Sequence, residues 1–475
     1  MNNLSMIFGA PGCGKTTYLI NLLKSLLNSF DPDKIAFVSF TKKGSYEGRD
    51  RAVAEFGYKE KDLPFFRTIH SLAFRDLGMS KHDMINHRNY REFSKAMGMN
   101  FLGYYTEDLV NNDDKFLAYC GLLKNNPVRA KEEESTLDYA KAMLVRREYE
   151  RYKKEVGIVD FDDLIVDFVK QDKPLPVKVA IIDEAQDLTT LQWQFCSVAF
   201  RNCTKVYIAG DDDQAIYEWS GADVHEFLKF KDAPGTDVTI LNQSYRLRKK
   251  ILEYSKTITG MIKERVDKNF NYISEGGEVH YHHSVEELSM DSESTWYFLS
   301  RNRMFLKTYQ EFLMKKGVVF NYKHEPSVDM GMYEAVWEYE RLRKTEPEKI
   351  AKSVKLSPYL RADRSFDAPW YDAFTMTPEV SKYYRDLFKN KTDVRKCTID
   401  VNTIHGVKGG EADNVVVYLG VTKRVYENFK LSQNALDSEL RCLYVALTRA
   451  KKKLHIVFPS TKFGYDELLN NRSLL

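Results

Sequence analysis

Short runs of apolar residues separate longer amphipathic segments along this chain. Leu4–Phe8 is one such run, and the segment behind the glycine-rich loop that follows it repeats leucine at helical spacing, at positions 19, 22, 23, 26 and 27. A second run, Val179–Ile182, is typical of a strand buried on both faces of a parallel sheet. The pattern predicts an α/β fold that opens with a strand, a glycine loop and a helix.

A long helical segment interrupts this α/β pattern. The two apolar runs are separated by far more residues than one crossover helix requires. From about residue 71 to residue 157 the pattern is helical, and one apolar stripe contains Leu137, Ala140, Leu144 and Tyr152. We expect a helical insertion on the surface of the first core.

Composition narrows the class of protein. The chain has 475 residues, of which 43% are hydrophobic, enough for two or more cored domains. Lys and Arg number 71 against 68 Asp and Glu, so a net charge of +3 does not by itself indicate a polyanionic partner. The six cysteines form no CxxC pair, which argues for free thiols in a reducing compartment. No apolar run approaches the roughly 20 residues of a membrane helix, so we expect a cytoplasmic protein with no membrane partner.

The glycine loop has the full P-loop spacing for binding a nucleotide phosphate. Glycines allow backbone amides to turn toward a phosphate, Lys15 adds a positive charge, and the Thr16 hydroxyl suits Mg²⁺. The helix behind the loop contributes its dipole. We expect ATP to contact Gly9, Ala10, Pro11, Gly12, Cys13, Gly14, Lys15, Thr16 and Thr17.

Two acidic residues end the second apolar run. Asp183 is placed to hold Mg²⁺ together with Thr16, and Glu184 is placed to orient or deprotonate an attacking water. The alternative to a catalytic role for these two residues is an acidic helix N-terminus.

Further motifs follow in a fixed order. The segment VYIAGDDDQAIYEWSGAD (Val206–Asp223) resembles the third motif of UvrD/Rep-type superfamily 1A DNA helicases. Other segments resemble that family's remaining motifs: Phe37–Gly44, Arg67–Arg75, Val159–Leu164, Leu241–Leu247, Val401–Gly420 and Glu439–Leu454.

The resemblance implies two RecA-like P-loop NTPase domains, each with a mainly helical insertion, and ATP between them. It implies that Gln214 touches the γ-phosphate, and that Arg246 and Arg449, from the second half of the chain, act as arginine fingers. A surface salt bridge is the alternative for each arginine. Tyr245 resembles the family residue that stacks on adenine, and Glu411 the one that holds the ribose.

The resemblance also implies contacts with single-stranded DNA. Hydroxyl groups and Lys42 suit phosphates, whereas flat aromatic rings stack on any base without reading sequence. Trp219 lies in a polar loop, which favours a stacking role over a core role. The DNA-binding residues implied are Phe40, Thr41, Lys42, Thr68, His70, Tyr217, Trp219, Thr403 and His405.

Three departures from the family pattern alter these expectations. Only eight residues precede Gly9, so we expect the family's adenine-reading segment to be missing and Tyr245 to recognise the base mainly by stacking. Ser220 stands where an arginine is common. The accessory insertion is small, and its aromatic residues suit either a packed helical core or a contact with a duplex or partner.

The expected domains follow from these segments. They are a first RecA-like core (1–70 and 158–240), its helical insertion (71–157), a second core (241–322 and 397–475) and a small accessory insertion (323–396).

The expected function is that of a monomeric, ATP- and Mg²⁺-dependent 3′-to-5′ DNA helicase acting on single strands and on single/double-strand junctions. Two alternatives remain: a DNA-stimulated translocase that displaces proteins and unwinds weakly, and a P-loop NTPase without a nucleic-acid partner.

Overall fold

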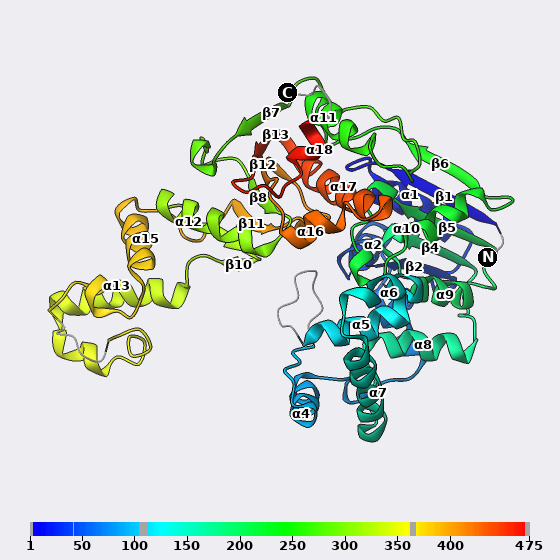
Figure 1. Cartoon of the computed structure of the whole chain (residues 1–475), viewed down its shortest axis with the longest axis horizontal. Helices are drawn as coiled ribbons and strands as arrows, with labels where there is room; N and C mark the ends of the chain where they lie inside the picture. Colours follow the sequence, from blue (N-terminus) through cyan, green and yellow to red (C-terminus); the bar gives the residue numbers. More distant parts are fainter. Residues whose placement is uncertain (1–2, 41, 104–112, 362–366, 471–475) are drawn as a thin grey trace. The chain divides into compact units, whose positions relative to one another are not determined.

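The chain folds into two units, each built on its own β-sheet (Figure 1). The computed structural model describes residues 3–40, 42–103, 113–361 and 367–470. The first unit comprises Met1–Glu275 and Ser432–Tyr444, and the second comprises Gly276–Leu431 and Val445–Leu475. Both sheets are mainly parallel, which confirms the predicted α/β fold class.

The first sheet is parallel throughout its described strands, in the order β3-β2-β4-β5-β1-β6. Its central strands are short and apolar, as expected for strands covered on both faces. The strands are β1 (Leu4–Gly9), β2 (Ile35–Ser39), β3 (Phe66–Thr68), β4 (Val179–Asp183), β5 (Lys205–Gly210) and β6 (Asp237–Leu241).

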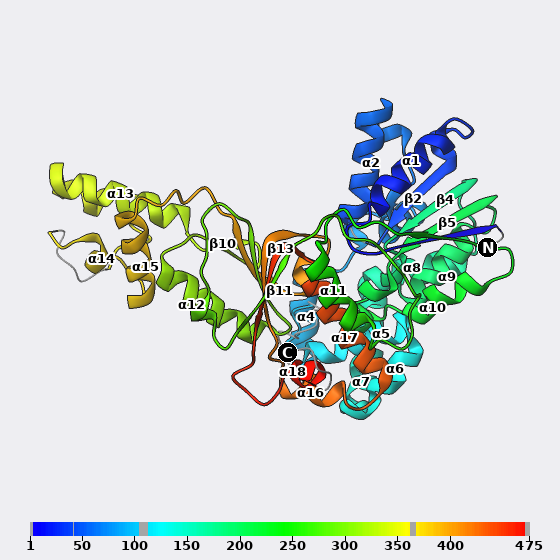
Figure 2. The same cartoon turned by 90° about the horizontal axis from the view of Figure 1, so that it is seen from above.

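Alternate side chains of these strands enter two separate cores. On β1, Met6 and Phe8 pack with α3, α8 and α9, whereas Ile7 packs with α1. The same alternation occurs on β4, where Ile182 joins the first group and Ile181 the second. Figure 2 shows α1 and α2 on one side of the sheet and α8, α9 and α10 on the other.

The helices of the first unit include both the sheet-covering helices and an inserted group. They are α1 (Lys15–Leu27), α2 (Lys42–Phe56), α3 (Ile69–Asp76), α4 (His87–Met97), α5 (Asp114–Asn125), α6 (Pro127–Glu133), α7 (Tyr139–Val156), α8 (Phe161–Gln171), α9 (Thr190–Ala199), α10 (Val224–Lys229), α11 (Lys249–Thr259) and most of α17 (Gln433–Leu447).

Helices α4 to α7 have a hydrophobic core of their own. Phe93 stacks on Phe101 and contacts Tyr149, and Leu117 and Val145 are buried beside them. This group occupies the segment for which the sequence predicts a helical insertion. Short 3₁₀ helices, such as Lys81–Asp83 and Glu134–Thr136, lie between the longer elements.

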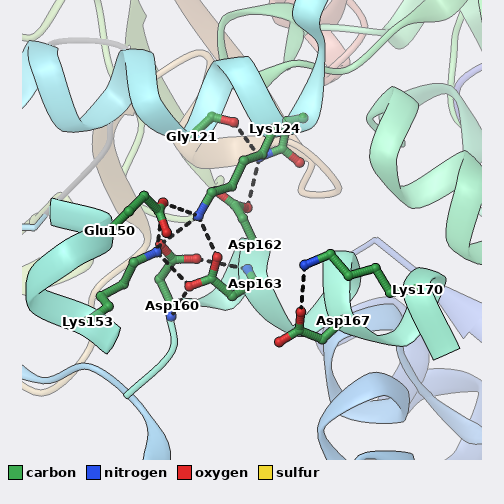
Figure 3. Close-up of polar contacts among 10 residues, drawn as sticks. Gly121, Lys124, Glu150, Lys153, Asp160, Asp162, Asp163, Asp167 and Lys170 are labelled. Atoms are coloured by element: carbon green, nitrogen blue, oxygen red, sulfur yellow. Dashed lines mark hydrogen bonds and ion pairs between the residues drawn. The ribbon is translucent and has the colours of Figure 1, made fainter. Parts of the chain in front are cut away.

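Buried ion pairs connect this insertion to α8 (Figure 3). The Lys153 ammonium, on α7, lies 2.6 Å from carboxylate oxygens of both Asp160 and Asp163 and 3.1 Å from Glu150. Lys124, on α5, reaches the same three acids at 2.6 to 3.2 Å. The three carboxylates lie within 4.8 Å of one another, a spacing that would suit a metal ion, but each of them already pairs with two ammonium groups.

The second sheet has the order β10-β9-β11-β8-β12-β13-β7 and is parallel except for the β9–β10 pair. Its strands are β7 (Glu278–His282), β8 (Trp296–Ser300), β9 (Asn321–Tyr322), β10 (Glu325–Pro326), β11 (Ile399–Thr403), β12 (Ala412–Tyr418) and β13 (Ala450–Val457). The helices that follow are α12 (Leu306–Lys316), α13 (Met330–Thr345), α14 (Trp370–Ala373), α15 (Pro378–Lys389), α16 (Lys423–Asn428), α17 (Gln433–Leu447) and α18 (Asp466–Asn470).

The accessory segment, with α13 to α15, shares one core with the second sheet. Tyr339, Trp370 and Tyr383 are buried in the same cluster as Phe298 of β8. Most aromatic side chains of this segment therefore pack, whereas Trp337 is 61% exposed.

The two compact units divide after Glu275, whereas the sequence patterns predict a domain boundary between residues 240 and 241. The backbone N–H of Tyr245 donates to the carbonyl of Gly12, 2.7 Å away, so the segment 241–275 packs on the first unit. The second sheet receives its first strand, β7, only after that segment.

None of the helices within the described ranges has the length and apolar character that a bilayer crossing requires.

We predict that Lys153→Met destabilises the inserted helices by about 3–5 kcal/mol, because removing one partner of a buried ion pair leaves uncompensated charge. Burial acts to raise the pKa of Asp163, but Lys124 and Lys153 outweigh it and lower that pKa to about 2. The stabilisation is therefore complete above the ordinary carboxyl pKa and is lost as the pH falls toward 2. Hydrogen exchange of α7 amides, referenced to α1, measures the change at pH 7.

Lys170→Met is the matched control. Lys170 pairs with Asp167 at 3.2 Å on the exposed side of α8, and its removal should change stability by less than about 0.5 kcal/mol. Equal α7 exchange in the two variants would contradict an anchoring role for Lys153.

Candidate nucleotide and nucleic-acid site

The P-loop joins the carboxyl end of β1 to the N-terminus of α1. Gly12 and Gly14 adopt left-handed backbone angles, with φ of 68° and 78°, which glycine reaches without strain. A Cβ atom at Gly9 would lie only 2.3 Å from the Cys13 sulfur, so the loop is too tight for a larger residue there. The loop therefore turns directly into the first helical amides, where an anion is stabilised.

Lys15 is the positive charge of this loop. Its ammonium donates to the carbonyl of Gly9 at 2.9 Å. Burial acts to lower the pKa of Lys15, but the nearby carboxylates of Glu184, Asp211 and Asp183 outweigh it and raise that pKa. Lys15 is therefore charged, and it lies near Asp183 and Glu184, the two acids that the sequence predicts around ATP.

Cys13 is buried beside Lys15. Burial raises the pKa of the Cys13 thiol, and Asp211 raises it further, although Lys15 opposes both. The thiol is accordingly protonated at neutral pH and a poor nucleophile.

Asp183 and Glu184 follow directly from β4. Asp183 is 4% exposed and accepts a hydrogen bond from the backbone N–H of Glu184 at 2.9 Å. Glu184 has a left-handed backbone, with φ of 52°, an uncommon conformation for a residue other than glycine. The conformation ends the strand abruptly and starts a short 3₁₀ turn.

Gln186 connects Glu184 to the loop after β5. Its side-chain amide donates to Glu184 at 2.6 Å, and its amide oxygen accepts from the backbone N–H of Asp211 at 3.0 Å. Gln214 then donates to the Asp211 carboxylate at 2.6 Å. Gln186 is not among the site residues predicted above, although its place in the DEAQD segment was a usable signal.

Tyr245 and Arg246 lie against the P-loop. A Cβ atom added at Gly14 would be 3.7 Å from the Tyr245 ring, and one at Gly12 would be 2.4 Å from Cβ of Arg246. The Tyr245 ring is 65% exposed. Both residues belong to the first unit rather than to the second half of the fold, so the structure places Arg246 beside Gly12 within a single unit.

Arg449 and Glu411 belong to the second unit. Arg449 is buried, and its guanidinium donates to the carbonyls of Val445 and Gly410, each at 3.0 Å. Glu411 is exposed and lies 3.7 Å from the Lys451 ammonium.

Three of the aromatic residues expected to bind DNA contact one another. The Phe40 and Tyr217 rings lie 5.2 Å apart, and Tyr217 meets Trp219 edge-on at 6.3 Å. The Trp219 indole N–H is buried and has no hydrogen-bond partner among the described residues. Thr41 and the Lys42 side chain, two further candidates, lie outside the described residues.

The remaining candidates have local partners. Thr68 caps α3 by accepting from the N–H of Ser71, and Thr403 accepts from the N–H of Gly406. Burial lowers the pKa of His70 to about 4, only partly offset by Asp160, so this imidazole is neutral at pH 7. His405 lies in the 3₁₀ turn after β11.

Comparisons with known proteins agree with the order of these elements. Residues 1–234 match the family model of the UvrD/REP helicase N-terminal domain, and residues 380–461 match that of the UvrD-like helicase C-terminal domain. A solved structure of PRRSV helicase aligns with 97% of this chain and 53% of its own chain, at 11% identity and a TM-score of 0.35.

Two curated relatives show the same relationship. ATP-dependent DNA helicase PcrA of Staphylococcus aureus is 25% identical over 307 residues, 59% of this chain and 41% of the relative. ATP-dependent DNA helicase Rep of Buchnera aphidicola subsp. Baizongia pistaciae is 27% identical over 276 residues, 53% of this chain and 40% of the relative. The chain thus matches about two fifths of the length of these relatives. With both family models matched in order and the P-loop site assembled, this chain belongs to the UvrD/Rep-type family of superfamily 1A helicases.

Proposed function

We propose that this protein is an ATP-driven DNA helicase that moves 3′ to 5′ along single-stranded DNA. The observation that carries the proposal is the linked set of Lys15, Glu184 and Gln214 at the carboxyl ends of three parallel strands. Both relatives described above are named ATP-dependent DNA helicases. The polarity follows from the ordered motifs that resemble that family.

In this proposal the P-loop amides and Lys15 hold the ATP phosphates. The oxygen donors of Thr16 and Asp183 fit the preference of Mg²⁺ for hydroxyl and carboxylate ligands. Mg²⁺ bound there would neutralise part of the charge on the β- and γ-phosphates. Tyr245, exposed beside the loop, offers a flat face for adenine, and we assign ribose binding to Glu411 by the resemblance.

We assign proton removal from the attacking water to Glu184. The hydrogen bond from Gln186 orients its carboxylate, so the base is held before the nucleotide arrives. Arg246 and Arg449 supply positive charge to the transition state in this proposal. Arg246 lies against Gly12 within the first unit, whereas Arg449 is contributed by the second unit.

The DNA-binding surface that we propose is centred on the rings of Phe40, Tyr217 and Trp219. Because these rings contact one another, bases that stack on them meet a continuous aromatic group. Thr68, Thr403 and His405 provide hydroxyl and imidazole groups for phosphates, joined by Thr41 and Lys42 from the resemblance. His70, being neutral at pH 7, contributes a hydrogen bond and no charge.

We further propose that the protein acts as a monomer on single strands and junctions in the cytoplasm, where its six free cysteines stay reduced. A second candidate function is a translocase that displaces proteins and unwinds weakly. The short accessory segment favours it, since α13 to α15 pack into the core of their own sheet.

We predict that Glu184→Gln binds Mg-ATP nearly as well as the parent but loses about 10²- to 10⁴-fold in kcat, because general base catalysis contributes that much. Nucleotide Kd and kcat are measured separately, with and without oligonucleotide. Parent ATPase should rise with DNA, and a 3′-tailed duplex should be unwound in preference to a 5′-tailed one.

The outcomes separate the candidate functions. DNA-stimulated ATPase with protein displacement and no unwinding would select the translocase, and ATPase indifferent to DNA would reject both nucleic-acid functions. A near-normal kcat for Glu184→Gln would exclude Glu184 as the base.

We predict that Trp219→Ala loses translocation efficiency while keeping its DNA-free ATPase. The variant removes about 1–3 kcal/mol of stacking per base, comparable to the roughly 1.4 kcal/mol of opening one base pair. The measurement is base pairs opened per ATP on a 3′-tailed duplex. Tyr139→Ala, which removes an exposed aromatic ring from α7, serves as the control and should retain parental coupling. Unchanged coupling in Trp219→Ala would assign the stacking contact to Tyr217 or Phe40.

A further inference from the structure

Two cations from the segment behind α11 are buried against three consecutive acids. The Lys268 ammonium lies 3.1 Å from Asp211 and 3.0 Å from Asp213, and it also bonds to Asp212. Arg265 makes a two-point contact with Asp213, at 2.9 and 2.8 Å. The side chains of Lys268 and all three acids are 0% exposed.

The three buried carboxylates stabilise the charged form of Lys268 and depend on its positive charge. Burial acts to lower the pKa of Lys268, but the carboxylates of Asp212, Asp211 and Asp213 outweigh it and raise that pKa. Three buried carboxylates and two cations give the cluster a formal charge of −1 if all five groups are ionised. Loss of Lys268 would therefore leave these carboxylates strongly under-compensated.

The contacts of the three acids are not equivalent. Asp213 has Arg265 as a second cationic partner, and Asp212 also accepts the backbone N–H of Val266 at 2.7 Å. Of the two cations, only Lys268 is in contact with Asp211. Lys268 is thus the cation that holds the carboxylate nearest to strand β5.

Asp211 uses its two oxygens in different ways. One oxygen, Oδ1, faces the Lys268 ammonium and also accepts the backbone N–H of Asp213 at 3.3 Å. The other, Oδ2, accepts the side-chain amide of Gln214 at 2.6 Å. The backbone N–H of Asp211 is bonded to Gln186, which also holds Glu184. Lys268 and the backbone N–H of Asp213 therefore orient the carboxylate on which the Gln214 amide rests.

We propose that Lys268 is a positioning residue for γ-phosphate recognition, acting through Asp211 on Gln214. The inference rests on the proposed function, in which Gln214 contacts the γ-phosphate. Lys268 does not touch the nucleotide. It holds the Asp211 carboxylate, from which the Gln214 amide must turn away in order to bind a γ-phosphate. In this way Lys268 affects the difference in affinity between nucleotides with and without a γ-phosphate.

The experiment measures binding of ADP and of a non-hydrolysable ATP analogue to the full chain with Mg²⁺, together with kcat. Lys268→Met and Gln214→Ala should each reduce the preference for the ATP analogue about 10-fold and kcat about 10²-fold, as expected for a displaced catalytic group. ADP affinity should stay within about twofold of the parent. The double variant should show no further loss, because both changes act on one contact.

Folding is controlled with two further variants. Lys268→Met/Asp212→Asn restores the cluster to its formal charge of −1 and keeps an oxygen acceptor for the Val266 N–H. It should fold as the parent does, judged by circular dichroism, and still lose γ-phosphate discrimination. Lys268→Arg retains the positive charge and should recover, relative to Lys268→Met, part of the preference for the ATP analogue over ADP.

Lys249→Met, at the start of α11, is the matched control. Lys249 pairs at the surface with Glu275, 3.2 Å away, and should behave as the parent. A folded Lys268→Met or Lys268→Met/Asp212→Asn variant with parental discrimination, or losses that add to those of Gln214→Ala, would overturn the positioning role. Absence of DNA-stimulated ATPase in the parent itself would instead reject the proposed function.

Discussion

The carboxyl ends of parallel strands lie at one edge of a sheet, and the candidate nucleotide site of the first unit depends on this constraint. Gly9 ends β1, Asp183 ends β4 and Gly210 ends β5. The phosphate loop, the acidic pair and the loop that contains Gln214 therefore begin side by side, although long stretches of chain separate them. The same edge receives Thr68 from β3, so the nucleotide and nucleic-acid candidates share one framework.

Placing so many polar groups at one edge creates a problem of buried charge. An isolated carboxylate is costly in the interior, and burial is tolerated when cations and hydrogen bonds compensate it. Two clusters in this unit meet that requirement with lysine: Lys268 beneath the loop after β5, and Lys153 with Lys124 at the start of α8. The Lys268 cluster joins the loop after β5 to a segment distant in sequence, and the other cluster joins α5 and α7 to α8, so each fixes geometry as well as charge.

The sequence predicted those parts of the site whose signal is local. The P-loop and the pair Asp183–Glu184 each lie within one short motif, and strand polarity brings them together without further information. Lys268 could not be found in this way, because it is one of many lysines and its partner Asp211 lies in another motif. The packing of the segment 241–275 on the first unit has no local signal for a similar reason: the contact between Tyr245 and Gly12 joins distant residues and leaves no periodic pattern.

The accessory segment shows the opposite case. There, helical periodicity distinguishes aromatic residues of a packed core from aromatic residues of an exposed surface. Ala335, Val336, Tyr339 and Leu342 recur at helical spacing and are buried, whereas Trp337 lies off that stripe and is 61% exposed. Composition alone could not distinguish core from surface there, because both contain aromatic residues. The helical phase of each residue distinguishes them.

The loop between Gln214 and Trp219 is held at both ends, and this limits how it can move. At one end, Asp211 is bonded to Lys268 and Gln214. At the other end, Glu218 lies 3.4 Å from the buried guanidinium of Arg441, which also donates to the carbonyl of Glu264 at 2.7 Å. Burial raises the pKa of Glu218, and Arg441 opposes that shift. Separating the pair would therefore leave the buried Glu218 carboxylate without its cationic partner.

A segment with such anchors does not deform by small continuous amounts. Displacing the Gln214 amide from Asp211 must either leave the Glu218 contact in place or exchange it, because packed interiors favour discrete arrangements over intermediate ones. Tyr217 and Trp219 flank Glu218 directly, so their rings follow whichever arrangement that anchor adopts. Under the proposed function, the physical link between nucleotide state and base stacking is therefore this doubly anchored loop.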